Sequence, residues 1–313
     1  MAFTNLLASN KQLYESSLVK SVNSRTINWA INCSDKNKIT GEVFNIAFGL
    51  KNLDLNSLQT LDSIINSSTA MGAISNSSTA MTAVIASSTA MTAVAASSTA
   101  MAAVAASSTA MTAVIASSTA MTAIAASSTA MAAIAASSTA CAAIKASPTA
   151  ITALDNSSPI HIPKMTSNTA PSGVASASSY YNVGGISCPA YLSMNKELIS
   201  VDTNWYAPAG YITNQWLQYK FTTPVWCYKV TLTNGNSTQP GCLPKNFKIQ
   251  YSSDGITFYD AITNVTQNLN NTLQTFNVCA ASGKNLYWRI FCIDTWISKD
   301  GFLGIGELDF FCK

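Results

Sequence analysis

The most regular pattern of apolar and polar positions in the chain is a ten-residue repeat. Eight units cover residues 71–150, from MGAISNSSTA to CAAIKASPTA, and degenerate units flank them at 61–70 and 151–160. The first position of each unit is Met, or Cys in the last unit, and the fourth is Val or Ile. Positions three residues apart lie on one side of a helix but on opposite faces of a strand. Because alanine favours helix and Ser-Ser-Thr supplies N-caps, the repeat predicts helix.

The repeat length raises the question of how this helix buries its apolar stripe. Ten residues turn a straight helix about 80° short of three full turns, so the stripe winds around the helix or the helix breaks at each Ser-Ser pair. A lone helix cannot bury so thin a stripe. We therefore expect a coiled-coil-like shaft of three parallel chains, with Met and Val/Ile facing the shared axis. A disordered Ala/Ser/Thr linker and an ice-binding or adhesin repeat are the alternatives, although a linker needs no regular apolar positions.

A different pattern, strict alternation, begins after residue 180. In WLQYKF (216–221) the side chains of Leu217, Tyr219 and Phe221 share one face, and NFKIQYSSDGITFYD (246–260) alternates before an Asp-Gly turn. Short alternating strands separated by turn signals predict an antiparallel sandwich. The predicted fold class is α + β: an elongated fibre with a helical repeat shaft, followed by an antiparallel β-sandwich of the jelly-roll type.

Shifts in composition divide the chain into four parts. Residues 1–60 carry mixed charges and predict an N-terminal attachment or capping region, and residues 61–156 form the repeat shaft. Residues 157–179 are rich in Pro, Ser, Thr and Ala, which is typical of a hinge or collar. Residues 180–313 form the predicted sandwich. The single histidine, His161, lies in the hinge, where we expect a packing or surface role.

Charge and composition exclude several classes of protein. Charged residues make up 10% of the chain and the net charge is +3, whereas soluble domains carry about 25% charged residues. This excludes a basic nucleic-acid arm and an acidic disordered tail. One histidine argues against a Ser-His-Asp triad, and the acidic residues show no paired spacing for acid/base catalysis. For these two reasons we do not expect an enzyme. No run of about 18 uninterrupted apolar residues occurs, so we expect no membrane insertion.

The cysteines add information about the compartment. No Cys-x-x-Cys pair occurs, and an even set concentrated after residue 187 predicts disulfides, which persist outside the cytosol. The N-terminus shows no secretory signal pattern. A virion protein that is made in the cytoplasm and released by lysis satisfies both observations. The eight are Cys33, Cys141, Cys188, Cys227, Cys242, Cys279, Cys292 and Cys312. We expect Cys33 and Cys141 to be reduced, with Cys141 replacing Met in the repeat.

Two segments resemble known families. The order of WYAPAG (205–210), NQWLQYKF (214–221), NFKIQYSSDGITFYD (246–260), YWRIFCID (287–294) and GIGELDFF (304–311) resembles the discoidin, or coagulation factor V/VIII type C, family. Members of that family are galactose-binding-like jelly-roll sandwiches. The decapeptide shaft resembles repeats of bacteriophage tail fibres. Together they imply a virion tail fibre, or receptor-binding protein, whose C-terminal sandwich adheres to a host cell-surface glycan.

The discoidin resemblance also implies a site, because ligand contacts in that family come from loops at one end of the sandwich. Aromatic faces and polar groups suited to a sugar occur in the loops at 202–214 and 234–246. The candidate ligand-binding residues are Asp202, Trp205, Tyr206, Tyr211, Asn236 and Gln239. The resemblance further implies a structural calcium at Glu307, although Lys196-Glu197-Leu198-Ile199 stands where the family has an Asp-Gly pair ahead of Thr203. It also implies a disulfide between Cys188 and Cys312, while the pairing of the other cysteines stays open.

The same resemblances imply the partners and the location. We expect a homotrimer, attached through its N-terminus to a phage tail or baseplate protein, on the virion and extracellular after release. We expect no nucleic-acid partner and no cofactor other than the calcium. A cell-surface adhesin or a fibre of a contractile injection system, with the same carbohydrate-binding tip, is the alternative. A glycan-cleaving tailspike is disfavoured because acidic residues are scarce.

Overall fold

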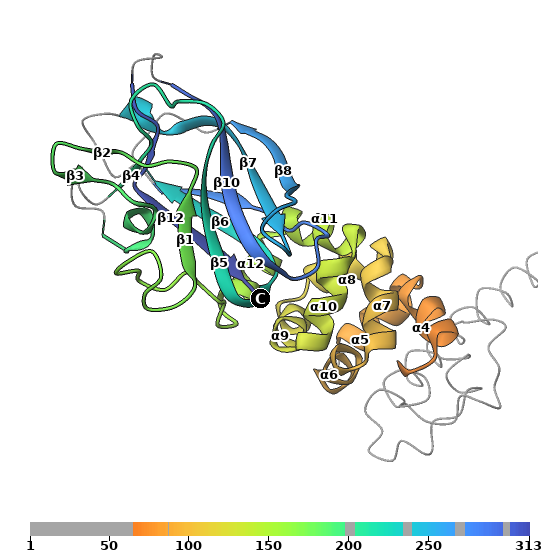
Figure 1. Cartoon of the computed structure of the whole chain (residues 1–313). Helices are drawn as coiled ribbons and strands as arrows, with labels where there is room; N and C mark the ends of the chain where they lie inside the picture. Colours follow the sequence, from red (N-terminus) through yellow and green to blue (C-terminus); the bar gives the residue numbers. More distant parts are fainter. Residues whose placement is uncertain (1–64, 87, 198–203, 234–239, 267–272, 297–300) are drawn as a thin grey trace, which may run out of the picture. The chain divides into compact units, whose positions relative to one another are not determined.

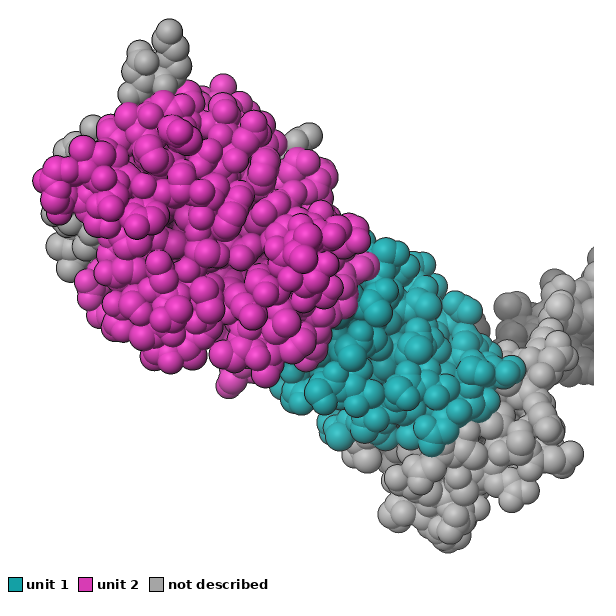
Figure 2. Space-filling model, in the orientation of Figure 1, with its two compact units in different colours: residues 1–143, 147–153 teal, residues 144–146, 154–313 magenta. Residues whose placement is uncertain are grey.

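A computed structural model describes residues 65–313 except 87, 198–203, 234–239, 267–272 and 297–300. The predicted attachment region, residues 1–60, therefore lies outside the described residues. The chain divides into two compact units (Figure 2), one of residues 1–143 with 147–153 and the other of residues 144–146 with 154–313. The first unit carries the decapeptide repeat and the second carries the strands.

The repeat folds as one short helix per ten-residue unit (Figure 1). The helices are α4 (Ser68–Ser75), α5 (Ser78–Ile85), α6 (Ser88–Ala96), α7 (Ser98–Ala106), α8 (Ser108–Ile115), α9 (Ser118–Ala126), α10 (Ser128–Ala136), α11 (Ser138–Ala146) and α12 (Pro148–Asp155). Helix was the predicted element, and it is confirmed for the described units.

Each helix begins after the serine at position seven of its unit. Ser107 is typical: its backbone is extended, with φ −96° and ψ 119°, and its side chain accepts a hydrogen bond from the N–H of Ala110. An extended residue between two helices breaks the helical path, so α7 and α8 are bent by 97° and α9 and α10 by 100°. Of the two alternatives that the ten-residue period left open, the helix breaks at the Ser-Ser pairs.

The bends coil the chain so that each helix packs against the helix three units further on, α4 against α7 and α7 against α10. Met81, Met91 and Met101 are buried, as is the alanine before each of them. Hydroxyls at position seven donate to carbonyls at position five, 32 residues earlier. The pairs are Ser97 with Ile65, Ser107 with Ser75, Ser127 with Ala95, Ser137 with Ala105, and Ser147 with Ile115.

This arrangement differs from the expected coiled-coil-like shaft of three chains. The Met and Val/Ile side chains are buried, as predicted, but they are buried within one chain. The physical reason is that short helices with extended serines between them bring distant turns of the same chain together, so no second chain is needed to cover the stripe. Among the described helices, no single one is long and apolar enough to cross a membrane. The pairs α7–α8 and α9–α10 pass that test only together, by length and composition.

The second unit contains the predicted antiparallel sandwich (Figure 1). A five-stranded sheet has the order β1-β5-β10-β7-β8, and a three-stranded sheet has the order β12-β6-β9. Their bounds are β1 Val174–Ala177, β5 Gln215–Val225, β6 Cys227–Thr233, β7 Pro244–Ser252, β8 Tyr259–Thr266, β9 Gln274–Asn277, β10 Asn285–Thr295 and β12 Glu307–Cys312. Two short pairs complete the set, β4 (Trp205–Tyr206) with β11 (Gly304–Ile305) and β2 (Asn182–Val183) with β3 (Ile186–Ser187). The 3-10 helices are η2 (Ala190–Met194) and η4 (Pro240–Cys242).

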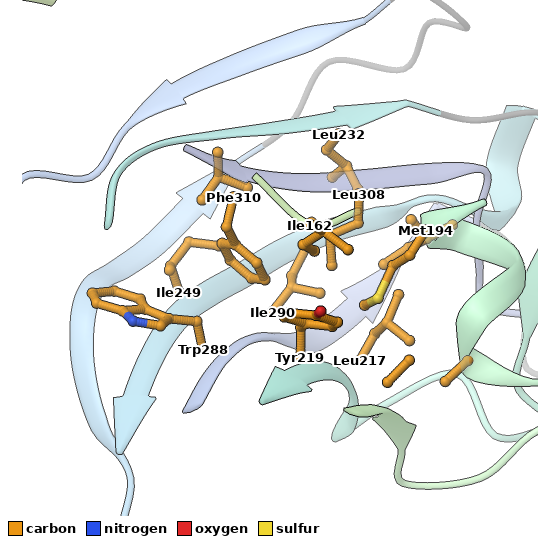
Figure 3. Packing of buried hydrophobic residues seen from close by; sticks show 14 of the residues in the cluster. Ile162, Met194, Leu217, Tyr219, Leu232, Ile249, Trp288, Ile290, Leu308 and Phe310 are labelled. Atoms are coloured by element: carbon orange, nitrogen blue, oxygen red, sulfur yellow. The ribbon is translucent and has the colours of Figure 1, made fainter. Parts of the chain in front are cut away.

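The core lies between the two sheets (Figure 3). Leu217, Ile249 and Ile290 of the larger sheet meet Leu308 and Phe310 of the smaller one, and all are fully buried. The strand alternation predicted from Leu217, Tyr219 and Phe221 is confirmed, because these three side chains all belong to this core. The other face of the same strands carries polar and aromatic side chains.

The segment predicted as a hinge, residues 157–179, is part of the sandwich. Its residues 174–177 form β1, which pairs with β5, and Ile160 bridges to Cys312. Ile162 and Met165 are each 1% exposed and belong to the sandwich core. The Nδ1 of His161 lies 3.1 Å from Asp309 Oδ2. A Pro- and Ser-rich composition therefore did not mark a linker here, because its few apolar side chains complete the core.

The cysteines also differ from the prediction. Cys312 forms no disulfide and lies opposite Cys227 on the adjacent strand, whereas Cys188 packs with Tyr206 and Cys242 in a separate cluster. The predicted Cys188–Cys312 disulfide is therefore not formed. The physical reason is that Cys312, at the end of the last strand, packs in the main core, whereas Cys188 packs in the separate cluster. Cys141 is a buried thiol at the Met position of its repeat, as predicted.

Candidate functional site

Three loops meet at one end of the sandwich, where β5 and β7 begin and β10 ends. The N–H of Gly210 donates to the carbonyl of Gly301 at 3.0 Å, and Thr295 Oγ1 donates to the carbonyl of Gly241 at 2.7 Å. These bonds join the described segments 207–214, 240–243, 295–296 and 301–303, which we call the end loops. Their common position follows from β10, which pairs with both β5 and β7.

Two aromatic side chains of the end loops are exposed. Tyr211 is 56% exposed and Trp296 is 39% exposed. The Nζ of Lys245 lies 4.8 Å from the centroid of the Trp296 ring, a cation–π contact that keeps a positive charge beside this ring. Exposed aromatic rings with polar groups nearby offer both an apolar face and hydrogen-bonding partners to a ligand.

Trp205, predicted to contact ligand, is a core residue instead. It is fully buried, its Nε1–H donates to the carbonyl of Ser179 at 2.8 Å, and its backbone N–H donates to Ser193 Oγ at 2.9 Å. Its strand, β4, pairs with β11 and buries both of its side chains. The ring is therefore inaccessible to a ligand, and the prediction for Trp205 is wrong.

Tyr206 is also buried, with 5% exposure, although it was predicted to contact ligand. Its ring makes an edge-on contact with Phe302 and packs with Cys188 and Cys242, and its hydroxyl accepts a hydrogen bond from Asn204. Tyr211 is the one predicted aromatic that is exposed in the described end loops. Asp202, Asn236 and Gln239 lie outside the described residues, so their roles stay predictions.

Glu307, the predicted calcium ligand, is buried beside a lysine. Its Oε2 accepts a hydrogen bond from the backbone N–H of Lys196 at 3.1 Å. The Lys196 Nζ lies 3.5 Å from Glu307 Oε1 and 2.9 Å from Asp309 Oδ2. Burial raises the pKa of Glu307 to about 7, against the lowering effect of the Lys196 charge, and Asp309 raises it further. This carboxyl therefore titrates near neutrality.

The residues around Glu307 do not fit calcium. The ion takes six to eight oxygen ligands, and the ammonium of Lys196 already lies between the two carboxylates. Over the described ranges, no group of three or more His, Cys, Asp or Glu side chains could hold a metal. A lysine charge thus supplies the neutralisation that a cation would supply. Among the residues that the structure describes, the buried Glu307 Oε1 has no hydrogen-bond partner.

Sequence reasoning did not identify Trp296 and Lys245. Trp296 directly follows the last residue of β10. An aromatic residue just beyond the end of a strand is a sequence signal for an exposed ring. The signal is weak, because a tryptophan beside a loop can also be buried, as Trp205 is at the start of the two-residue strand β4. Lys245 lies near the start of β7, and no sequence pattern distinguishes it from other lysines. Only its contact with Trp296 in the folded chain makes it a candidate site residue.

Comparison with known proteins agrees with this architecture. Residues 174–308 match the F5/8 type C domain family, so the C-terminal part of the chain is a discoidin-like domain of that class. The match covers less than half of the chain, and a search of curated proteins found no match.

Solved structures with a similar fold include two from Clostridium perfringens. One is a module in complex with GalNAc-β-1,3-galactose, which is 17% identical, with a TM-score of 0.38 and coverage of 44% of this chain and 94% of that one. The other is a family 32 carbohydrate-binding module in complex with galactose, 18% identical, with a TM-score of 0.36 and coverage of 44% and 93%. An F5/8 type C domain from Bacteroides fragilis is 14% identical, with a TM-score of 0.36 and coverage of 49% and 95%.

Proposed function

We propose that this chain is a non-catalytic adhesion protein whose F5/8 type C domain binds a glycan through the end loops. The exposure of Tyr211 and Trp296 on loops that hydrogen bonds join at one end of the sandwich carries the proposal. A sugar ring presents an apolar C–H face and a rim of hydroxyls, so it needs an aromatic surface and polar groups together. Lys245 beside Trp296 supplies such a polar group.

We further propose that the protein is a phage tail fibre that attaches to a host surface glycan. Residues 1–60 would attach to a tail or baseplate protein, and the repeat would serve as a spacer between attachment and binding. The repeat supports a spacer, because its apolar side chains are buried within the chain and its exposed positions hold Ala, Ser and Thr. Location on the virion and assembly into a homotrimer remain predictions that follow from the resemblance of the repeat.

Glycan-array binding of the full chain tests the first proposal. We expect binding to a subset of neutral glycans, and Tyr211→Ala or Trp296→Ala should weaken it roughly tenfold, as loss of an aromatic anchor does. Tyr259→Ala is the matched control, because Tyr259 is 58% exposed on β8, outside the end loops. No array binding, or equal losses for Tyr211→Ala and Tyr259→Ala, would refute the end-loop site.

Native mass measurement and adsorption assays test the fibre. A homotrimer has three times the 33.0 kDa chain mass. A phage that carries Tyr211→Ala in this chain should adsorb to its host less well than one that carries Tyr259→Ala. A monomer by native mass would remove the trimer from the proposal, and unchanged adsorption would remove host attachment.

A further inference from the structure

The outer face of the five-stranded sheet carries an ordered lattice of side chains. Because side chains alternate along a strand, the residues between the core positions Leu217, Ile249 and Ile290 point away from the core. The strand register aligns them in three rows across β7, β10 and β5. The rows are Lys248–Phe291–Trp216, Gln250–Arg289–Gln218 and Ser252–Tyr287–Lys220. We call these nine residues the outer lattice.

Arg289 lies at the centre of the outer lattice and is held in place from several sides. Its guanidinium carbon lies 3.5 Å from the centroid of the Phe258 ring and 5.6 Å from those of Trp216 and Phe291. Its Nε–H donates to Gln250 Oε1 at 2.7 Å. Within the part of the chain that the structure describes, its two Nη nitrogens make no hydrogen bond. A fixed guanidinium with free donors can bind a carboxylate in bidentate fashion.

The charges around Arg289 leave the outer lattice positive. Two carboxylates contact the outer lattice. Asp260, on β8, accepts from Lys248 at 2.8 Å and from Gln250 at 2.7 Å, and Asp254 accepts from Ser252 at 2.8 Å. Lys220 lies 5.4 Å from the Tyr287 ring centroid. Burial lowers the pKa of Arg289 to about 10 and the Asp260 charge opposes this, so the guanidinium stays cationic at neutral pH. Three cations, Arg289, Lys248 and Lys220, therefore stand against two carboxylates.

We propose that the outer lattice is a second carbohydrate site, separate from the end loops, and that it takes an acidic polysaccharide of the polyuronate type. A uronate carboxylate pairs with the free Nη donors of Arg289. The apolar faces of its sugar rings lie on Trp216 and Phe291, which are partly exposed. Gln250 is buried and holds Arg289 in place from below, because its Oε1 accepts from Arg289 while its Nε2 donates to Asp260. Within a row, neighbouring side chains lie on strands about 4.8 Å apart. A chain of sugars that runs along the row Lys248–Phe291–Trp216 therefore meets a cation or an aromatic ring on each strand.

An anionic sugar polymer fits these residues better than a nucleic acid does. A phosphate backbone is bound by clusters of Lys and Arg without acidic neighbours, whereas Asp260 lies within this network and the whole chain carries only +3. Aromatic rings beside a single oriented guanidinium suit a ligand that combines carboxylates with apolar ring faces.

Calorimetric titration of the full chain with polygalacturonate tests this proposal. We expect saturable binding, and Arg289→Lys should weaken it roughly tenfold, because the charge is retained but the two-pronged donor is lost. Trp216→Leu should weaken it by a similar factor. Lys284→Gln is the control for the loss of one positive charge outside the outer lattice, since Lys284 is exposed just before β10. Thermal unfolding of each variant should match that of the unchanged chain.

The end-loop site and the outer lattice are distinguished by their variants. Tyr211→Ala should leave polygalacturonate binding unchanged, and Arg289→Lys should leave neutral-glycan binding unchanged. Equal affinity of Arg289→Lys and Lys284→Gln would overturn the outer-lattice site. Binding of inorganic polyphosphate as tight as that of polygalacturonate, with no effect of Trp216→Leu, would also overturn it, since charge alone would then explain binding.

Discussion

Replacement of Ser107 by alanine tests the coiling of the repeat within one chain. The Ser107 hydroxyl donates to the carbonyl of Ser75 at 2.7 Å and accepts from the N–H of Ala110 at 3.3 Å. It therefore caps the start of α8 and also satisfies a carbonyl near the end of α4. Ser107→Ala removes both bonds, whereas Ser108→Ala changes the neighbouring, exposed serine of the same pair.

The magnitude follows from these two bonds. Loss of an N-cap costs about 1 kcal/mol, and loss of a buried hydrogen bond that leaves its acceptor unpaired costs about 1–2 kcal/mol. Because Ser107 is 7% exposed, water cannot readily replace either bond. We expect Ser107→Ala to lower the free energy of unfolding of the repeat by about 2–3 kcal/mol, and Ser108→Ala to change it by less than about 0.5 kcal/mol.

Urea unfolding of the full chain, observed in two ways, measures this difference. Circular dichroism at the helix band reports on the repeat. Tryptophan fluorescence reports mainly on the sandwich, because five of the six tryptophans lie between residues 205 and 296; Trp29→Phe in every variant removes the sixth. Ser107→Ala should move the helical transition to lower urea and leave the fluorescence transition unchanged.

Equal helical transitions for Ser107→Ala and Ser108→Ala would refute the intrachain coil. In an unbroken helix, position 107 has no partner 32 residues earlier, since the same stretch spans about 48 Å at 1.5 Å per residue. The experiment therefore also decides between the coiled single chain and a straight helical shaft.

Three further predictions concern buried side chains, which lie in the sandwich except for Cys141 of the repeat. Burial raises the pKa of Glu307 from 4.5 to about 7, so the folded state binds the proton more tightly and the stability due to this group falls as pH rises through that window. Glu307→Gln should thus raise the free energy of unfolding by at most about 3 kcal/mol at about pH 8 and have little effect near pH 4.5, measured by thermal unfolding. Trp205→Ala should destabilise the sandwich by about 3–5 kcal/mol in urea, whereas Tyr211→Ala should leave it unchanged. The cysteine thiols at 141, 188, 227, 242, 279, 292 and 312 are buried, so a thiol reagent should modify them only after denaturation.

Much of the local structure follows from the sequence alone. Alanine, the Met and Val/Ile positions and the serine caps decide that the repeat is helical and which side of it is apolar, because these are interactions between residues a few positions apart. Alternation likewise decides which face of the strand 216–221 enters the core. The family resemblance placed Tyr211 in a loop at one end of the sandwich, where it is 56% exposed, and its contact with a ligand stays a prediction.

Other features were decided only by tertiary structure, because they depend on residues far apart in the chain. Whether the repeat breaks or winds depends on the bond from Ser107 to Ser75, 32 residues away. Trp205 and Trp296 both lie near strand ends, yet only packing against distant segments buries the first and leaves the second exposed. The environment of Arg289 requires the register of β10 against β5 and β7, since its neighbours come from strands that no local pattern brings together.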